Sequence, residues 1–374
     1  MSEFIPIASS DLTGNELKYV QECIETNWIS SKGRFVKEFE EGFAKYCNSK
    51  YGIATSNGTT ALHLALESLG IGEGDEVIIP NLTFAATINA VLYTGAIPVL
   101  VDIDENSWNI NVKKIEEGIN NRTRAIIPVH LYGQPCDMDR LVEIANKYNL
   151  YIIEDCAEAH GAEYKGQKVG GFGDIACFSF YGNKIITTGE GGICLTNDKR
   201  LNEKMRILRD HGMNPKKRYW HKEIGYNYRM TNLQAAIGLA QLERIDELLI
   251  KRREIARKYD ANLKEMKGII TQKSFKNRDK VCWLYSILID PNNCSISRDR
   301  LIKELLNYNI DSRPFFYPLN KMDIYKKYGF DNNLEISEQI SLQGINLPVL
   351  VEMNEEKINY ISNIINKICC ENLI

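Results

Sequence analysis

The 374-residue chain lacks the features that mark several large classes of protein. Its formal net charge is only −3 at pH 7, so no excess of positive charge favours nucleic acid or an anionic membrane as a partner. No apolar run approaches the roughly 20 residues needed to span a bilayer. The N-terminal segment has neither the basic start nor the apolar core of a signal peptide. We therefore expect a cytoplasmic globular protein.

Metal-binding patterns are also missing. The ten cysteines are scattered without a C-x-x-C pair, and the five histidines show no metal-ligand spacing. In a large chain without a secretory signal, such cysteines are typical of reduced, buried thiols. We expect no metal site.

An alternation of short apolar runs and longer amphipathic stretches fills residues 51–197. Strands are predicted at 51–55, 76–80, 97–103, 125–131, 151–155, 175–180 and 191–197. Helices are predicted at 59–70, 84–95 and 138–150. Strands that are apolar on both faces and separated by helices favour an α/β fold with a mostly parallel sheet. Ligands of such sheets bind beyond the carboxyl ends of the strands.

The pattern changes after this region. One long helical stretch is predicted at about 227–266, and it leads out of the sheet domain. The remainder mixes a strand at 283–289 with a helix at 298–310. The sequence thus predicts a large domain over 1–250 and a smaller α+β domain over 251–374.

The segment SNGTTALHLAL, residues 56–66, places a glycine between a strand and an apolar helix. Free backbone N–H groups at Gly58, Thr59 and Thr60 would form an anion site at the start of that helix. The alternative is simple N-capping by Ser56 or Asn57. Taken alone, this motif leaves both interpretations open.

Two carboxylates, Glu154 and Asp155, end the predicted strand at 151–155. A carboxylate at this end of a central strand points toward the ligand crevice. There it could hold a protonated ring nitrogen through a charge-assisted hydrogen bond. The alternative is a helix N-cap, for which aspartate is well suited.

A lone lysine, Lys184, follows another apolar strand in FSFYGNKIITTGEGG, residues 178–192. Burying an ammonium group is costly unless it is paired or neutralised. The segment lacks the frame of a phosphate-clamp lysine, G-x-x-x-x-G-K-[ST], whereas a structural ion pair stays open. An anion site, a strand-end aspartate and a lysine able to form a Schiff base together indicate pyridoxal 5'-phosphate (PLP).

Five segments distributed over essentially the whole chain carry a resemblance to a known family. They are SNGTTALHLAL, IIEDCAEAHGA, FSFYGNKIITTGEGG, GYNYRMTNLQAAIGLAQLERID and SRPFFYP. With these segments the chain resembles the DegT/DnrJ/EryC1/StrS sugar aminotransferases. The resemblance implies the fold-type I, aspartate aminotransferase-like fold of PLP-dependent transferases.

The resemblance also implies roles for individual residues. Lys184 resembles the lysine that binds PLP covalently, and Asp155 resembles the aspartate paired with the pyridine nitrogen. Glu158 stands where many members have a glutamine near the phenolic oxygen of the cofactor. The remaining matches are Phe84 for stacking on the ring and Gly58, Thr59 and Ser179 for the phosphate.

Contacts across subunits follow from the same resemblance. Asn227 matches a residue that reaches the phosphate from the partner subunit, which implies a homodimer with shared active sites. Arg229 is a candidate for binding a substrate carboxylate, with an interface ion pair as the alternative. Candidate acceptor contacts, which could equally be interface packing, are Tyr219, Trp220, His221 and Arg313.

The reaction implied is transfer of an amino group from an amino acid, glutamate first, to a nucleotide-linked 4-keto-6-deoxy sugar. GDP-4-keto-6-deoxymannose is the first choice of acceptor, in the synthesis of a surface polysaccharide such as a capsule or O-antigen. Other acceptors stay open: a dTDP- or UDP-linked keto sugar, or a small ketone such as dihydroxyacetone phosphate. Relatives that dehydrate sugars carry a histidine in the lysine position, so Lys184 disfavours that reaction. A non-catalytic regulatory protein on this fold is the last alternative.

Overall fold

The computed structural model describes residues 3–330 and 333–370. Its centre is a seven-stranded sheet in the order β1 (Tyr51–Thr55), β9 (Gly192–Thr196), β8 (Ile175–Ser179), β5 (Tyr151–Asp155), β4 (Thr123–Ile126), β2 (Glu76–Pro80) and β3 (Ile97–Val101). β9 runs antiparallel to both neighbours, and the other pairs are parallel. β9 follows β8 through a loop without a crossover helix, as an antiparallel neighbour allows. The predicted mostly parallel sheet is confirmed.

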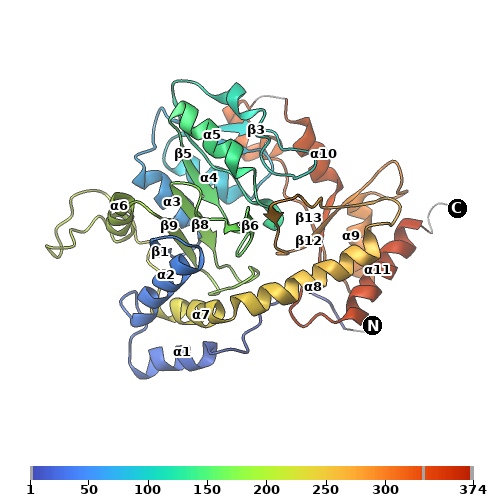
Figure 1. Cartoon of the computed structure of the whole chain (residues 1–374), viewed down its shortest axis with the longest axis horizontal. Coiled ribbons are helices and arrows are strands. Elements are labelled where there is room, and N and C mark those ends of the chain that lie inside the picture. The colour runs from blue at the N-terminus through green and yellow to red at the C-terminus, as the bar shows by residue number, and fades with distance from the viewer. Residues whose placement is uncertain (1–2, 331–332, 371–374) are drawn as a thin grey trace.

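Helices cover both faces of this sheet (Figure 1). One face carries α3 (Gly58–Ser68), α4 (Ala85–Tyr93) and α6 (Lys199–Arg209), and the other carries α2 (Arg34–Tyr46), α5 (Met138–Tyr148) and α7 (Asn232–Glu243). Successive strand side chains point to opposite faces. In β5, for example, Ile153 belongs to the cluster with α3, whereas Ile152 belongs to the cluster with α5. Double coverage explains why these strands are apolar on both faces.

The single helical stretch predicted at 227–266 is wrong. Residues 227–231 are not helical; α7 starts after Thr231, whose side chain accepts a hydrogen bond from the backbone N–H of Gln234. Arg244 then separates α7 from α8 (Ile245–Leu263), with a non-helical φ of −114° and ψ of 6°. The capping box at the start and the break at Arg244 thus divide the stretch.

The C-terminal part has its own antiparallel sheet in the order β10 (Ile269–Thr271), β12 (Tyr285–Ile289), β14 (Gly344–Leu347) and β13 (Arg313–Pro314). A separate apolar cluster joins it to α8, α9 (Arg298–Asn307) and α11 (Glu355–Cys370). The N-terminal segment lies beside this part, with bridges from Ile5 to Ile310 and from Ala8 to Val349 (Figure 1). The domain boundary at 250 and 251 stays a prediction.

The remaining elements are short or peripheral. They are α1 (Glu16–Glu25), α10 (Glu335–Gln343), the strands β6 (Glu163–Tyr164), β7 (Gln167–Lys168) and β11 (Arg278–Asp279), and 3-10 turns at Ile115–Gly118, Leu131–Gly133, Leu319–Lys321 and Asp323–Tyr328. In the part of the chain that the structure describes, no helix combines the length and apolar character needed to cross a membrane.

Candidate active site

A cavity of about 640 Å³ lies where several strands of the large sheet end. Its lining includes Asp155 from the end of β5 and Ser179 from the end of β8. Trp283 and Arg313 contribute from the C-terminal part. The cavity therefore occupies the position expected for a ligand of a parallel sheet, between that sheet and the smaller one.

An anion cradle forms one wall of the cavity. Asn57 caps α3 by accepting a hydrogen bond from the N–H of Thr60 at 2.9 Å. The expectation of a free N–H at Thr60 is therefore wrong, because the capping side chain already binds it. The N–H groups of Gly58 and Thr59, in the first turn, have no helix carbonyl four residues back to bind. A Cβ on Gly58 would lie 2.8 Å from the Cβ of Ser179, so only glycine lets the helix start approach that strand end. The capping and anion-site interpretations are therefore compatible.

The carboxylate of Asp155 is buried at the end of β5 and lines the cavity. It accepts hydrogen bonds from Thr87 Oγ1 at 2.9 Å and from the N–H of Ala157 at 3.2 Å. Burial raises its pKa, and these hydrogen bonds oppose that shift. A cation in the cavity would offset the desolvation of this carboxylate.

The neighbouring Glu154 points to the other face of the sheet. Its carboxylate accepts N–H groups of Gly170, Phe172 and Gly173 at 2.8–2.9 Å, and lies 3.2 Å from Nε2 of His130. These hydrogen bonds hold the pKa of Glu154 below its usual value despite burial. Of the two carboxylates that end this strand, only Asp155 therefore faces the crevice, because successive strand residues alternate between faces.

His130, Glu154 and Cys156 also bring potential metal-ligand atoms within 4.8 Å of one another. His130 Nδ1, however, faces the backbone N–H of Cys136 at 3.0 Å. The three backbone donors to Glu154 likewise use its oxygens. The hydrogen bonds already present account for this cluster as a structural one.

The ammonium group of Lys184 enters the cavity between a carboxylate and an aromatic ring. Its Nζ lies 3.8 Å from Oε1 of Glu158 and 3.9 Å from the centroid of the Trp283 ring. Burial lowers the pKa of Lys184, and burial raises the pKa of Glu158 to about 7. The other oxygen of Glu158 accepts the N–H of Tyr132 at 2.8 Å. Burial therefore favours the neutral form of both groups, whereas their mutual attraction favours the ion pair.

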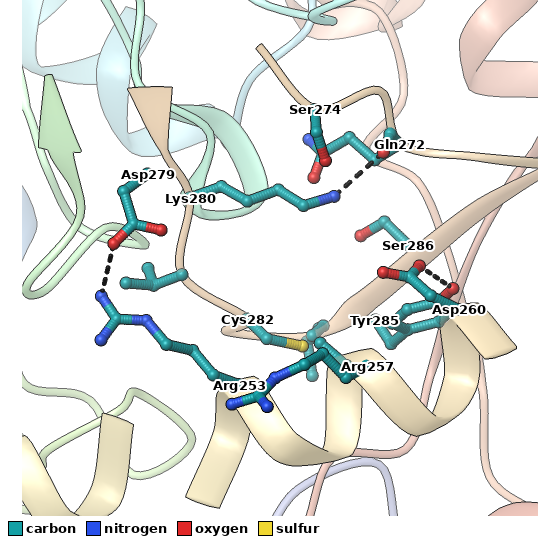
Figure 2. A pocket seen from close by; sticks show the side chains of 13 residues that line it. Arg253, Arg257, Asp260, Gln272, Ser274, Asp279, Lys280, Cys282, Tyr285 and Ser286 are labelled. Carbon is teal, nitrogen blue, oxygen red and sulfur yellow. Dashed lines mark hydrogen bonds and ion pairs between the residues drawn. The ribbon is translucent and has the colours of Figure 1, made fainter. Parts of the chain in front are cut away.

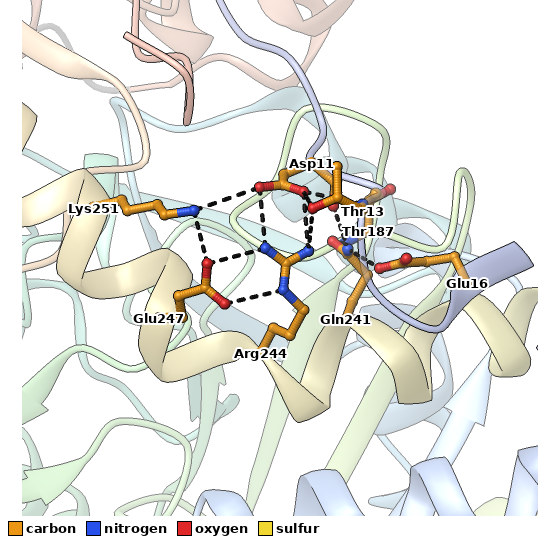
Figure 3. A network of polar contacts seen from close by, with 8 residues as sticks. All are labelled: Asp11, Thr13, Glu16, Thr187, Gln241, Arg244, Glu247 and Lys251. Atoms are coloured by element: carbon orange, nitrogen blue, oxygen red, sulfur yellow. Dashed lines mark hydrogen bonds and ion pairs between the residues drawn. The ribbon is translucent and has the colours of Figure 1, made fainter. Parts of the chain in front are cut away.

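Side chains from distant parts of the chain fix the loop that carries Lys184. Gln241 accepts the N–H of Thr187 at 3.4 Å and donates at 2.7 Å to both the carbonyl of Asp11 and the carboxylate of Glu16 (Figure 3). Nearer the lysine, Trp283 Nε1 donates to the carbonyl of Asn183 at 2.8 Å. These contacts restrict the positions that Lys184 can take.

The ring of Phe84 is 58% exposed, and it lines the cavity just before α4. Its centroid lies 5.5 Å from that of Phe316, another lining residue. An apolar ring with a free face beside a polar cavity suits stacking on a flat heterocycle.

The structure brings eight of the predicted site residues to this cavity: Gly58, Thr59, Phe84, Asp155, Glu158, Ser179, Lys184 and Arg313. PLP fits this set, because the anion cradle suits its phosphate and Asp155 its ring nitrogen. The lysine lies within the same cavity as both. The buried carboxylate of Asp155 would thus face the ring nitrogen of PLP, and the exposed ring of Phe84 would face its pyridine ring.

The five other predicted residues lie on the segment 211–229. Its middle projects beyond α6 (Figure 1), and its end returns to the large sheet, where Arg229 bridges to Thr55. Tyr219 is 73% exposed and Trp220 53%. Arg229 forms an ion pair with Asp210 at 2.8 Å, and its Nε donates to Asn227 at 3.1 Å. Nδ1 of His221 lies 2.8 Å from the carbonyl of His211. None of the five lines the cofactor cavity of its own chain.

Thr87, Tyr132 and Trp283 also belong to the site, although no motif of the sequence indicates them. Trp283 begins the strand predicted at 283–289, yet its ring contacts Lys184 across 99 positions of sequence. Tyr132 contributes a backbone N–H, which carries no signal of its residue type. Thr87 lies three residues after Phe84, within the helix predicted at 84–95, and its position alone does not indicate the hydrogen bond to Asp155.

Known proteins similar to the chain cover nearly all of it. The model of the DegT/DnrJ/EryC1/StrS aminotransferase family matches residues 10–366. The GDP-perosamine synthase of Caulobacter vibrioides is 51% identical over 95% of both proteins, and that of Escherichia coli O157:H7 is 47% identical over 98% of both. The solved PLP form of Spr1654 from Streptococcus pneumoniae matches with a TM-score of 0.93, at 29% identity over 100% of both chains.

Proposed function

Since this chain belongs to the DegT/DnrJ/EryC1/StrS aminotransferase family and is a PLP-dependent aminotransferase, we propose that it acts on a GDP-linked keto sugar. It transfers the amino group of L-glutamate to GDP-4-keto-6-deoxy-D-mannose, giving GDP-perosamine. The observation that carries this proposal is the 51% and 47% identity, over nearly full length, to two proteins named GDP-perosamine synthase.

PLP, when bound, supplies an electron sink for moving the amino group. Gly58, Thr59 and Ser179 hold its phosphate, and Phe84 covers one face of its ring. Asp155 remains a carboxylate when a positive ring nitrogen faces it, which keeps that nitrogen protonated. These residues fix the position of the substrate relative to Lys184.

Lys184 Nζ carries a proton during the reaction. The neutral amine accepts a proton, and the buried position favours this neutral form by lowering the pKa of Lys184. Glu158 lies 3.8 Å away and limits that shift while its carboxylate is ionised. The lysine is thereby poised to take up a proton and to return it.

The active enzyme is a homodimer in which Asn227 reaches the phosphate bound by the partner. Exposed apolar side chains support an interface that one chain leaves open; they include Trp28, Ile29, Trp220 and Ile224, the last 90% exposed. The dimer acts in the cytoplasm, and its product serves a surface polysaccharide such as a capsule or O-antigen.

A half-reaction tests the proposal. The PLP-loaded enzyme is treated with glutamate, excess donor is removed, and ketones are offered singly: GDP-4-keto-6-deoxymannose, its dTDP and UDP counterparts, and dihydroxyacetone phosphate. The readout is the rate at which the visible absorbance of the starting enzyme returns. Rapid return with the GDP sugar alone is the expected result.

If the absorbance returns only with a different ketone, the enzyme is still an aminotransferase, but the proposed acceptor is wrong. If glutamate leaves the absorbance unchanged, the donor is wrong, and other amino acids are then tested in the same way. A chain that responds to no donor would support a regulatory role on this fold.

A further inference from the structure

A second cavity, of about 240 Å³, lies in the C-terminal part against α8 (Figure 2). Residues of α8 form one wall, and the segment 279–286 forms another. Leu284 lines both this cavity and the cofactor cavity. The 281–286 segment therefore separates two different ligand-sized spaces.

Cationic side chains outnumber carboxylates around the second cavity. The cations are Arg253, Arg257 and Lys280, and the carboxylates are Asp260 and Asp279. Arg253 pairs with Asp279 at 2.9 Å, and Asp260 accepts the hydroxyl of Tyr285 at 2.7 Å. One positive charge is left without a carboxylate to balance it.

Lys280 crosses the cavity without an ion pair to any described residue. Its Nζ donates to the carbonyl oxygen of Gln272 at 3.0 Å (Figure 2). A carbonyl oxygen carries only part of a negative charge, and burial lowers the pKa of Lys280. A half-buried ammonium of this kind, without a carboxylate partner, is stabilised when an anion approaches it.

The side chain of Gln272 supplies an independent observation. It is only 9% exposed, and its Nε2 has no hydrogen-bond partner among the described residues. The Nε of Arg253 is also buried without a partner there. Buried N–H groups without an acceptor are rare and unfavourable, so the lining has donors available for an acceptor-rich ligand.

We propose that this cavity binds the phosphate group of a small molecule, through Lys280, Arg257 and the amide N–H of Gln272. Guanidinium and ammonium groups bind phosphate through charge-assisted hydrogen bonds. The cavity is smaller than the roughly 300–1,000 Å³ of pockets for drug-sized ligands, which excludes a whole nucleotide sugar. The apolar lining by Ala256, Val281 and Leu284 suits a short organic group on a phosphomonoester.

A ligand in this cavity would contact a segment that supports the active site. Val281 N–H donates to the carbonyl of Gly133 at 3.1 Å, next to the residue whose N–H binds Glu158. Trp283, two residues further, contacts Lys184. A ligand bound in the second cavity therefore contacts the segment 281–286, whose other contacts position Glu158 and Lys184.

The test is calorimetric titration of the PLP-loaded enzyme, in which the cofactor already occupies the phosphate cradle. The probes are glycerol 3-phosphate, inorganic phosphate and glycerol, each at constant ionic strength. We expect glycerol 3-phosphate to bind with a Kd of about 1 mM or below, and glycerol not to bind. Equal binding of inorganic phosphate would identify free phosphate as the ligand; tighter binding of glycerol 3-phosphate would identify a phosphomonoester.

Matched variants locate the binding. Gln272→Glu replaces the unpaired N–H donor by a carboxylate, which repels the phosphate, and should weaken binding of glycerol 3-phosphate at least tenfold. Arg257→Gln, an exposed position that leaves the fold intact, should weaken it severalfold. Lys264→Gln removes a positive charge from an exposed residue at the end of α8 outside this lining, and should change the Kd less than twofold.

Two outcomes would overturn the proposal: no binding of either phosphate probe at 10 mM, or binding that survives unchanged in both Gln272→Glu and Arg257→Gln. In the latter case the probe occupies another site, such as the one that receives the acceptor. Binding is measured without donor or acceptor, so failure of this proposal is distinct from failure of the proposed reaction.

Discussion

The cofactor cavity and the segment 211–229 differ in how far one chain satisfies their side chains. In the cavity, Asp155 and Glu158 are buried and the side chain of Lys184 is only 10% exposed, and each has contacts from more than one element. In the projecting segment, Tyr219 and Trp220 lie mostly exposed. The chemical centre is thus built within one chain, whereas the projecting segment leaves aromatic side chains exposed, as the proposed homodimer requires.

The strongest test of the first region is Lys184→Ala. We expect a loss of amino transfer of at least about 10³-fold, because the residue that carries the proton is gone. The visible absorbance of the PLP-loaded protein should also change, since the amine that binds PLP is missing. Lys165→Ala, an exposed lysine paired with Asp139, is the control and should keep both. Activity near the wild-type level in Lys184→Ala would refute the assignment of this lysine.

The adjacent carboxylates give a sharper contrast. Asp155→Asn keeps the shape but removes the charge that faces the cavity, and we expect about a 10²-fold loss of kcat with little change in the free energy of unfolding. Glu154→Gln should instead destabilise the fold by about 1–3 kcal/mol, because buried backbone donors lose a charged acceptor. Steady-state kinetics and urea unfolding of both variants measure the difference. Equal kinetic losses would mean that the two side chains do not act on opposite faces.

The second region is tested by mixing two defective chains. Asn227→Asp places a carboxylate against the phosphate and should reduce activity by tens of fold. If Asn227 contributes to the partner's site, a heterodimer of the Asn227→Asp and Lys184→Ala chains has one intact site of two. Random reassembly of an equal mixture makes about half of the dimers heterodimers, so it should restore about a quarter of wild-type activity. Activity after unfolding and refolding of the mixture is the readout, with each variant refolded alone as control. No recovery in a mixture that forms heterodimers would place Asn227 in its own chain's site.

Local features of the fold could be read from the sequence. The ranges predicted for β1, β2 and β5 match the structure residue for residue, because strands covered by helices on both faces are short apolar runs between clear breaks. The cradle at Gly58 depends on a strand, a glycine and a helix that are contiguous. The alternation of side chains along a strand likewise places Glu154 and Asp155 on opposite faces.

Contacts between distant segments could not be predicted in this way. Nothing in residues 279–286 indicates that Trp283 reaches Lys184, or that the back of this segment lines a cationic cavity. The division at Arg244 is also tertiary in origin, since that side chain bonds to Asp11 in the N-terminal segment (Figure 3). A single sequence records residue types but not the pairings that folding creates.

The smallest expected effect concerns Glu158, at the boundary between structure and catalysis. Burial raises its pKa to about 7 from an ordinary value of 4.5. The folded state therefore holds a proton that the unfolded state releases, and this contribution to stability is full below pH 4.5 and is lost as the pH rises through 7. Glu158→Gln cannot ionise, so the stability of the cofactor-free variant relative to wild type should rise between pH 4.5 and 7.

Activity should respond in the same pH range. Without the Glu158 carboxylate, burial still lowers the pKa of Lys184, and no charge at position 158 opposes that shift. We therefore expect less than a tenfold change in kcat, and a weaker dependence of kcat on pH near 7. Thermal unfolding and kcat across pH 5–9 measure both effects, and the exposed Glu117→Gln is the matched control. If Glu158→Gln followed the wild-type profile in both, the carboxylate beside Lys184 would be a packing group whose ionisation the enzyme does not use.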